Sequence, residues 1–204
     1  MTQKPLRRNS DRAVSPVVGV MLMLVVTIII AAVVSAFSGG MASGQKKIPQ
    51  ATIQADYSIN DGMTIKHAGG DPLPLADIQF VIWDGPTFGP NIEQSTKQIL
   101  SLTKMNDDTG LPVMTDSGGY NTTALLAGST LSITAKDCYC DVLQPNIKPS
   151  DYVSGDATYP STGAEQARWG LCISNPNNVG KEFILALNDK NGNLIGRTNV
   201  KVTW

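Results

Sequence analysis

The sequence lacks most of what a metal site or a catalytic centre needs. Among 204 residues it holds one histidine, His67, and three cysteines, Cys138, Cys140 and Cys172. A structural zinc site takes four ligands, mostly Cys and His, so it would need all four of these residues, and with a single histidine in the chain we do not predict one. His67 precedes an Ala-Gly-Gly-Asp-Pro turn, which favours a strand residue over a general base. No phosphate loop or dinucleotide fingerprint occurs. We therefore predict no catalytic residue, no metal, no cofactor and no enzymatic activity.

Charge is absent from one long segment. No ionisable side chain occurs between Ala13 and Gln45, and residues 14–37 are almost all apolar. As a helix, these 24 residues would extend about 36 Å, enough to cross a hydrocarbon core. The preceding leader has a net charge of +3, whereas only two lysines follow the apolar run. This asymmetry predicts a cytoplasmic N-terminus and an exported remainder.

The exported part, from residue 48 onward, is mildly acidic. It carries ten basic and 16 acidic side chains, a balance of −6. It has no basic stripe of the kind that phosphate binding requires, so we expect no nucleic-acid partner. All three cysteines lie in this part, where disulfides persist. The sequence allows Cys138 or Cys140 to pair with Cys172, which leaves one thiol, and it also allows three reduced cysteines.

Three interpretations fit the first 45 residues. A secretory signal peptide has the basic start, and Ala36 or Ala42 could serve a peptidase, but its apolar stretch is shorter. An uncleaved signal anchor leaves the junction at Ser15 and Pro16 unexplained. In the third interpretation Ser15 caps a helix that begins at Pro16, since proline suits the first helical position. The residues before Ser15 are then extended, and a protease at the membrane face can cut there.

The junction resembles a known processing signal. Asp11-Arg12-Ala13 followed by Val14-Ser15-Pro16-Val-Val-Gly-Val is similar to the class III signal peptide of archaeal type IV pilins. In that family a prepilin peptidase cuts after a Gly or Ala preceded by charged residues. The resemblance places the cut between Ala13 and Val14, with Asp11 and Arg12 as recognition residues. Residues 65–82 are also similar to the first strands of such pilins.

The resemblance implies a structural role. It implies a single-pass membrane precursor with a cytoplasmic N-terminus, cleaved by the prepilin peptidase. An assembly ATPase and a membrane platform protein then build a helical homopolymer outside the cell. Adhesion, biofilm formation or cell-cell contact would be its uses. A different class remains open, which is a membrane-tethered surface module that binds sugar or another small ligand.

The apolar helix carries small residues at which copies could pack closely. Thr27, Ala31 and Ser35 repeat every four positions, as do Ala32 and Ala36, and Gly19 belongs to the same set. Gly39 and Gly40 then predict a kink or a helix end. We expect a cleaved leader at residues 1–13, a helix and Gly-rich neck at 14–47, and an extracellular domain at 48–204.

The exported domain has the pattern of an all-β fold. Short runs of β-branched and aromatic residues alternate with Gly, Pro, Asn and Asp. They predict strands at 51–59, 62–67, 76–83, 97–103, 129–135, 138–143, 168–174, 181–188 and 194–203. This number of strands is typical of a β-sandwich, immunoglobulin-like or partly barrel-like. Asn191-Gly192 predicts a hairpin turn. Residues 104–128 and 144–166 are expected to be long loops, and Asn121-Thr-Thr is a candidate glycosylation site.

Overall fold

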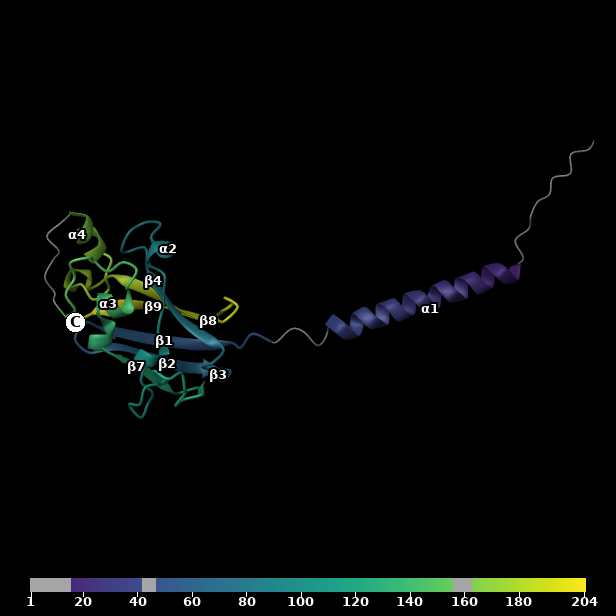
Figure 1. Ribbon diagram of the computed structural model, residues 1–204, viewed down its shortest axis with the longest axis horizontal. Helices are drawn as coiled ribbons and strands as arrows, with labels where there is room; N and C mark the ends of the chain where they lie inside the picture. Colours follow the sequence, from purple (N-terminus) through teal and green to yellow (C-terminus); the bar gives the residue numbers. More distant parts are fainter. Residues whose placement is uncertain (1–15, 42–46, 156–162) are drawn as a thin grey trace, which may run out of the picture. The chain divides into compact units, whose positions relative to one another are not determined.

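The computed structural model describes residues 16–41, 47–155 and 163–204. The chain divides into two compact units with the boundary between Lys47 and Ile48. The described part of the first unit is one helix, α1 (Pro16–Met41). The second unit is mostly β (Figure 1).

The second unit is built around a curled sheet of seven strands, a half-barrel, in the order β5-β4-β8-β9-β1-β2-β7. A two-stranded sheet pairs β3 with β6. The strands are β1 (Ala51–Ser58), β2 (Gly62–Gly70), β3 (Leu73–Pro74), β4 (Ile78–Asp84), β5 (Gln98–Ile99), β6 (Ala124–Leu125), β7 (Thr130–Thr134), β8 (Glu182–Asp189) and β9 (Leu194–Thr203). The short helices are α2 (Glu93–Thr96), η1 (Leu102–Lys104), η2 (Ala135–Cys138), α3 (Cys140–Leu143), α4 (Gly163–Trp169) and η3 (Pro176–Asn178).

Alternation of side chains explains the outer strands of the sheet. In β2, Met63, Ile65 and His67 are buried, whereas Thr64 and Lys66 are exposed. The pattern follows from the two-residue period of a strand that covers a core on one face. β1 and β2 form an antiparallel hairpin, and the turn needs Gly62, whose φ is +97°. A Cβ atom at Gly62 would lie 2.1 Å from the carbonyl oxygen of Ile133, so no other residue fits there.

The central strand β8 is buried on both faces. Phe183, Leu185 and Leu187 belong to the main core, and the neighbouring Ile184 and Ala186 are buried as well. Trp83 of β4 pairs with Ile184, and its ring lies 5.5 Å from the Arg197 guanidinium of β9. Because β9 lies on the far side of β8, the indole spans the outer face of β8 and covers it.

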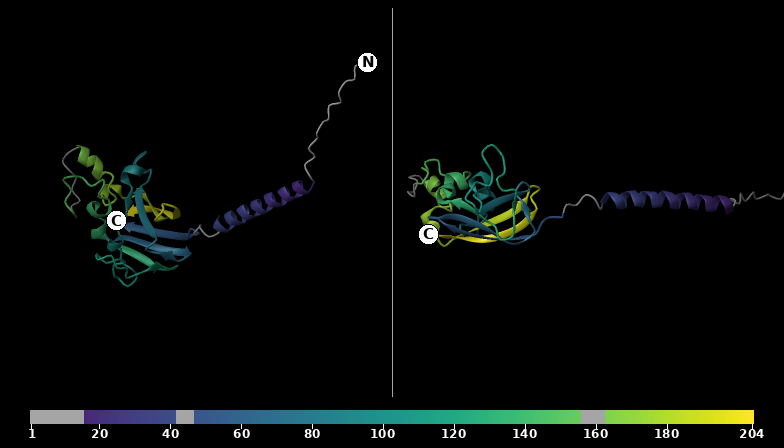
Figure 2. Two further views of the ribbon diagram at one scale, coloured as in Figure 1. Left: turned by 45° about the vertical axis from the view of Figure 1, so that its right-hand side comes forward. Right: turned by 90° about the horizontal axis from the view of Figure 1, so that it is seen from below.

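The partly barrel-like alternative is confirmed, because the strands of the described residues form one curled seven-stranded sheet and one two-stranded sheet, not two large sheets. The core contains buried residues of the long segment between β4 and β7, namely Leu100, Met105, Val113 and Leu125. These side chains fill the concave face of the curled sheet, as the second sheet of a sandwich would. Figure 2 shows the curvature of the sheet and the short helices α3 and α4 near the end where β9 finishes.

Two of the predicted strands are wrong and a third is shortened. Residues 138–143 contain the end of η2 and α3, and residues 168–174 contain the end of α4 and a turn. Their buried residues follow helical spacing of three and four: Cys140 with Leu143, and Trp169 with Cys172 and Ile173. The strand expected at 97–103 is confined to β5, because η1 begins at Leu102.

The predicted hairpin at Asn191-Gly192 is confirmed by the antiparallel pairing of β8 with β9. Its geometry differs from a two-residue turn, since of these two residues only Gly192 has a positive φ, +89°. The Asp189 carboxylate accepts hydrogen bonds from the backbone N–H groups of Asn191 and Asn193 at 2.9 and 2.8 Å. The turn is therefore closed by a side chain that caps backbone donors.

Candidate functional site

The apolar helix α1 is the most distinctive surface of the chain. It has 26 residues and no acidic or basic residue in its first or last turn, and it extends about 39 Å. Within Pro16–Ser38 the most apolar stretch of 18 residues has a mean hydropathy of 3.2, and the side chains of the segment are all exposed. A helix that is apolar on all sides suits a lipid bilayer or the interior of a protein bundle. By length and composition, α1 is able to cross a membrane.

The polar side chain in the middle of α1 is satisfied within the helix. The Thr27 hydroxyl donates to the Leu24 carbonyl oxygen at 2.8 Å. An unpaired hydroxyl would be costly to bury in hydrocarbon, and this bond removes that cost. The helix therefore requires no polar partner at this position when it is surrounded by apolar groups.

The six positions predicted for helix packing all lie on α1 with exposed side chains or, for Gly19, none. They are Gly19, Thr27, Ala31, Ala32, Ser35 and Ala36. Residues four apart are displaced by about 40° around a helix, so Thr27, Ala31 and Ser35 form a slowly winding stripe. A Cβ atom at Gly19 would have no neighbour within 4 Å. The stripe is open to another helix, and packing there remains a prediction.

The predicted processing site lies just outside the described residues. Asp11, Arg12, Ala13, Val14 and Ser15 are in that undescribed segment. Pro16, predicted as the first helical residue, lies in α1 and is also the first residue that the structure describes, so its place as the helix start stays a prediction. The cut after Ala13 therefore stays a prediction.

The structure joins Cys140 and Cys172 in a disulfide and leaves Cys138 as a buried thiol. This is one of the two pairings that the sequence left open. Burial raises the pKa of Cys138 to about 12. Because the thiolate is the reactive form, Cys138 is protected from exchange with the neighbouring disulfide.

A buried polar cluster lies at the end of β4, where sequence reasoning found no candidate. Asp84 is fully buried, and its Oδ1 accepts a hydrogen bond from Gln144 Nε2 at 3.1 Å. The backbone N–H of Asp84 donates to Thr96 Oγ1 of α2 at 3.0 Å. Burial raises the pKa of Asp84 to about 7, against the lowering effects of the Gln144 hydrogen bond and of Lys181. In the sequence, Asp84 precedes Gly-Pro and is typical of a turn, so nothing marks it as buried.

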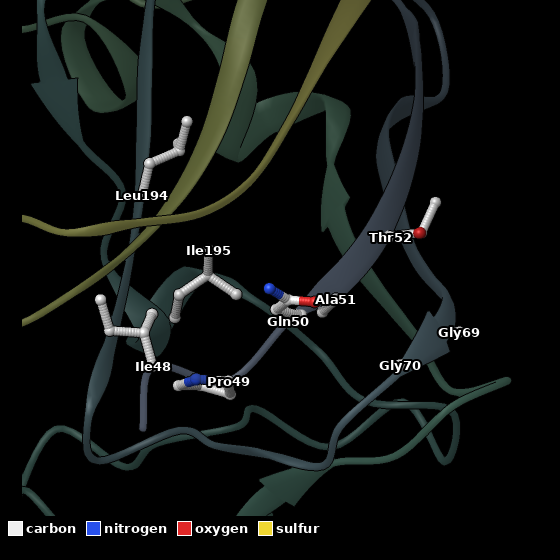
Figure 3. A pocket seen from close by; sticks show the side chains of 9 residues that line it. All are labelled: Ile48, Pro49, Gln50, Ala51, Thr52, Gly69, Gly70, Leu194 and Ile195. Carbon is white, nitrogen blue, oxygen red and sulfur yellow. The ribbon is translucent and has the colours of Figure 1, made fainter. Parts of the chain in front are cut away.

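Two further features of the domain are a surface hollow and the candidate glycosylation site at Asn121. A hollow of about 590 Å³ (Figure 3) is lined by Ile48, Pro49, Gln50, Ala51, Thr52, Gly69, Gly70, Leu194 and Ile195. These side chains carry no charge.

Asn121 is exposed, and its Nδ2 donates to the Pro112 carbonyl oxygen at 2.7 Å. A glycan at Asn121 would need access to this nitrogen, and its presence remains a prediction.

The described residues hold no group of three or more His, Cys, Asp and Glu side chains that could bind a metal ion. His67 lies in β2, as predicted, and is fully buried. Neither of its ring nitrogens has a hydrogen-bond partner among the described residues.

Comparison with known proteins identifies the first unit. Residues 12–53 match the sequence profile of the N-terminal region of archaeal type IV pilins. An uncharacterized protein of Archaeoglobus fulgidus is 37% identical over 78 residues, which cover 37% of this chain and 55% of that protein. The chain thus spans about half the length of this curated relative. The matched profile includes the junction at Arg12, the whole of α1 and the start of β1. The N-terminal region of the chain, residues 12–53, is therefore similar to that of archaeal type IV pilins, and a mostly β domain follows it.

Proposed function

We propose that this chain is a structural subunit of an extracellular type IV pilus-like filament. The observation that carries the proposal is α1, which is long, uncharged and exposed on every side within the matched pilin region. Such a helix is stable in lipid before assembly and among copies of itself afterwards, because neither environment has to neutralise a buried charge. The family is a structural one, and we propose no enzymatic role.

Processing is the step that frees the helix for assembly. The leader carries four basic residues and one acidic residue directly before α1. We propose that a prepilin peptidase cuts between Ala13 and Val14, which removes this charge and keeps α1. The precursor is then a single-pass membrane protein with a cytoplasmic N-terminus. An assembly ATPase and a membrane platform protein would lift it into the filament.

In the filament, the β domains would form the outer surface. They carry the net negative charge and the long polar segments of the chain. We propose that the filament mediates surface adhesion, biofilm formation or contact between cells. Cells that make only the unprocessed variant described next form no fibres, so they should attach to surfaces less than wild-type cells, and equal attachment would contradict this role.

N-terminal sequencing of sheared surface fibres tests the proposal. The expected fibre protein begins with Val14. An Ala13→Trp variant should accumulate in the membrane with its leader attached, and no fibres should form. An Ala42→Trp variant is the matched control, because Ala42 would serve a secretory peptidase instead, and its processing should be normal. Soluble single molecules that begin downstream of Phe37 would contradict the proposal, and a mature protein that stays in the membrane fraction would favour a tethered binding module.

A further inference from the structure

The inference concerns a part of the β domain that has its own small core. Residues 140–155 and 163–175, here called the disulfide lobe, contain the Cys140–Cys172 bond. Ile147 and Trp169 pack with these two cysteines in a cluster separate from the main core, whereas Leu143 and Ile173 of the lobe are buried in the main core. Both cysteines belong to the lobe, so the disulfide closes the lobe on itself and does not tie it to the sheet.

Asp84 and Gln144 connect the disulfide lobe to the sheet. Asp84 is the last residue of β4, and Gln144 directly follows α3. Gln144 Nε2 donates to Asp84 Oδ1 at 3.1 Å, and Gln144 Oε1 accepts from the backbone N–H of Ile173 at 2.7 Å. One side chain thus links the sheet to both ends of the lobe. Other polar contacts also leave the lobe. Asn146 Nδ2 donates to the Lys97 carbonyl oxygen at 3.4 Å in an exposed contact, and Asn178 Nδ2 of η3 donates to the Gly170 and Cys172 carbonyl oxygens at 3.0 and 2.7 Å.

The surroundings of the Asp84 carboxyl group disfavour its ionised form. Its Oδ2 is buried without a hydrogen-bond partner among the described residues. The side chains that Gln144 and Thr96 bring to Asp84 are neutral, and the charged group that acts on it is Lys181, in the turn before β8. Lys181 Nζ lies 4.8 Å from the centre of the Phe88 ring. A buried carboxylate with one hydrogen bond and one such neighbour is strongly disfavoured relative to the uncharged acid.

We propose that Asp84 is a proton-controlled clasp, which as the uncharged acid holds the disulfide lobe against the sheet and as the carboxylate releases it. The disulfide does not join the lobe to the sheet. Opening has to expose Leu143 and Ile173, which are buried in the main core, so the open lobe is a minor state of the kind that hydrogen exchange detects. Release lets water reach both carboxylate oxygens, which the closed arrangement prevents. The proposal concerns the β domain alone and does not depend on filament assembly.

The direction of the pH dependence follows from the two pKa values. In the closed lobe the pKa of Asp84 is about 7, and in the open lobe it approaches the ordinary value of 3.8. The closed state therefore binds the proton more tightly, and raising the pH favours opening. The opening equilibrium should increase up to about tenfold per pH unit above pH 4 and level off near pH 7, an increase on the order of 100-fold between pH 5 and pH 8.

Hydrogen exchange of the full chain in detergent micelles tests the clasp. The informative amides are those of Gln144, Ile147, Cys172 and Ile173, which are bonded within the lobe. Asp84→Asn keeps the Oδ1 acceptor but does not ionise. Comparing the two proteins at the same pH cancels the intrinsic pH dependence of exchange. The wild-type lobe should open on the order of 100-fold more, relative to Asp84→Asn, at pH 8 than at pH 5.

Two further variants make the test specific. Asp56→Asn removes an exposed carboxylate of β1 and should behave as wild type at both pH values. Gln144→Met removes the bridge while keeping a side chain of similar length, and its lobe should be unprotected already at pH 5. The proposal is overturned if the ratio between wild type and Asp84→Asn is the same at pH 5 and pH 8. It is also overturned if residues 51–70 lose protection as much as the lobe, or if the Gln144→Met lobe stays protected at pH 5.

If Asp84→Asn fails to fold, the wild-type profile remains decisive. Its exchange rates, corrected for intrinsic chemistry, should show lobe opening that rises from pH 5 and levels off near pH 7. A flat profile would overturn the clasp.

Discussion

The helix α1 and the β domain use the same aliphatic residues in opposite ways. Ile28, Ile29 and Ile30 of α1 are 62%, 56% and 56% exposed, whereas Ile65 and Ile133 of the sheet are 0% and 2% exposed. The β domain closes its core by itself, because its strands present one face to a shared interior. The helix has no such partner within the described chain, so its apolar surface needs lipid or other helices. Folding and assembly are therefore assigned to separate parts of the molecule.

The two regions also treat polar groups differently. In α1 the Thr27 hydroxyl bonds to the Leu24 carbonyl one turn away, so the helix is self-sufficient. In the β domain, polar side chains depend on distant segments: Gln144 bonds Asp84, which is 60 residues away. A defect in the helix should therefore appear in insertion or assembly, and a defect in the domain should appear in its unfolding.

A pair of phenylalanines tests this division most strongly. Phe183 is fully buried in β8 and packs edge-on to Tyr57 with ring centres 5.6 Å apart, whereas Phe37 of α1 is 67% exposed. Phe183→Ala should lower the unfolding free energy of the β domain by about 3–5 kcal/mol, because it removes buried area and leaves a cavity. Phe37→Ala should leave it unchanged. Denaturant unfolding of both variants in detergent micelles measures this, and equal losses would refute the division.

The disulfide lobe should be the part of the β domain that depends on a covalent bond. Its separate core has only four buried residues, so we expect the disulfide to supply a large share of its stability. Replacing both Cys140 and Cys172 with Ser removes a loop closure of 32 residues, which contributes about 3–4 kcal/mol in the chain-entropy model. Thermal unfolding should show the loss, and proteolysis should cut the lobe first. Cys138→Ala, which keeps the disulfide, is the control, and a similar loss for it would argue against the disulfide as the cause.

A charge placed on each exposed surface separates lipid-facing from water-facing exposure. Ile29 of α1 and Val153 of the β domain are 56% and 65% exposed. Ile29→Arg should cost about 2.5–3.5 kcal/mol at the centre of a spanning helix, or roughly a 100-fold loss of inserted or assembled protein. Val153→Arg should be neutral, because that surface faces water. Immunoblots of membrane and sheared-fibre fractions measure the outcome, and full assembly of Ile29→Arg would contradict our assignment of α1.

The smallest effect is expected at His67. Its buried imidazole has no hydrogen-bond partner among the described residues, in contrast to Thr27 of α1. His67→Leu should raise the unfolding free energy of the β domain by about 1 kcal/mol, because an unsatisfied polar group is replaced by an apolar one of similar size. Denaturant midpoints at neutral pH give the difference. A marked destabilisation would contradict the prediction, because it would show that the His67 imidazole makes a stabilising contact.

Much of the architecture follows from local pattern. The sequence predicts the strands near 51–59, 62–67, 76–83, 181–188 and 194–203 from runs of β-branched and aromatic residues. These runs are visible because each strand covers a core on one face or lies in the middle of the sheet. The predictions failed at 138–143 and 168–174. There, apolar residues three and four apart pack around a disulfide, and short helices of four to seven residues give too little periodicity to recognise.

The candidate sites also divide into those that a sequence pattern can predict and those that it cannot. The junction at Ala13 and the helix start expected at Pro16 are made of consecutive residues, so a sequence motif predicts them. The sequence does not indicate Asp84, because it is the first residue of an Asp-Gly-Pro segment, which is typical of an exposed turn. Its burial arises from Gln144, Thr96 and the disulfide lobe, which the chain brings to it from later segments.

The sequence by itself determined the length of α1, its lack of charge and the basic residues before it. These are properties of consecutive residues, and they decide how a helix partitions between water and lipid whatever surrounds it. Only the tertiary structure decided which cysteines pair, that the sheet curls over its own loops, and that one aspartate loses contact with water. Those outcomes depend on which side chains lie opposite one another in space, and residues far apart in the chain supply them.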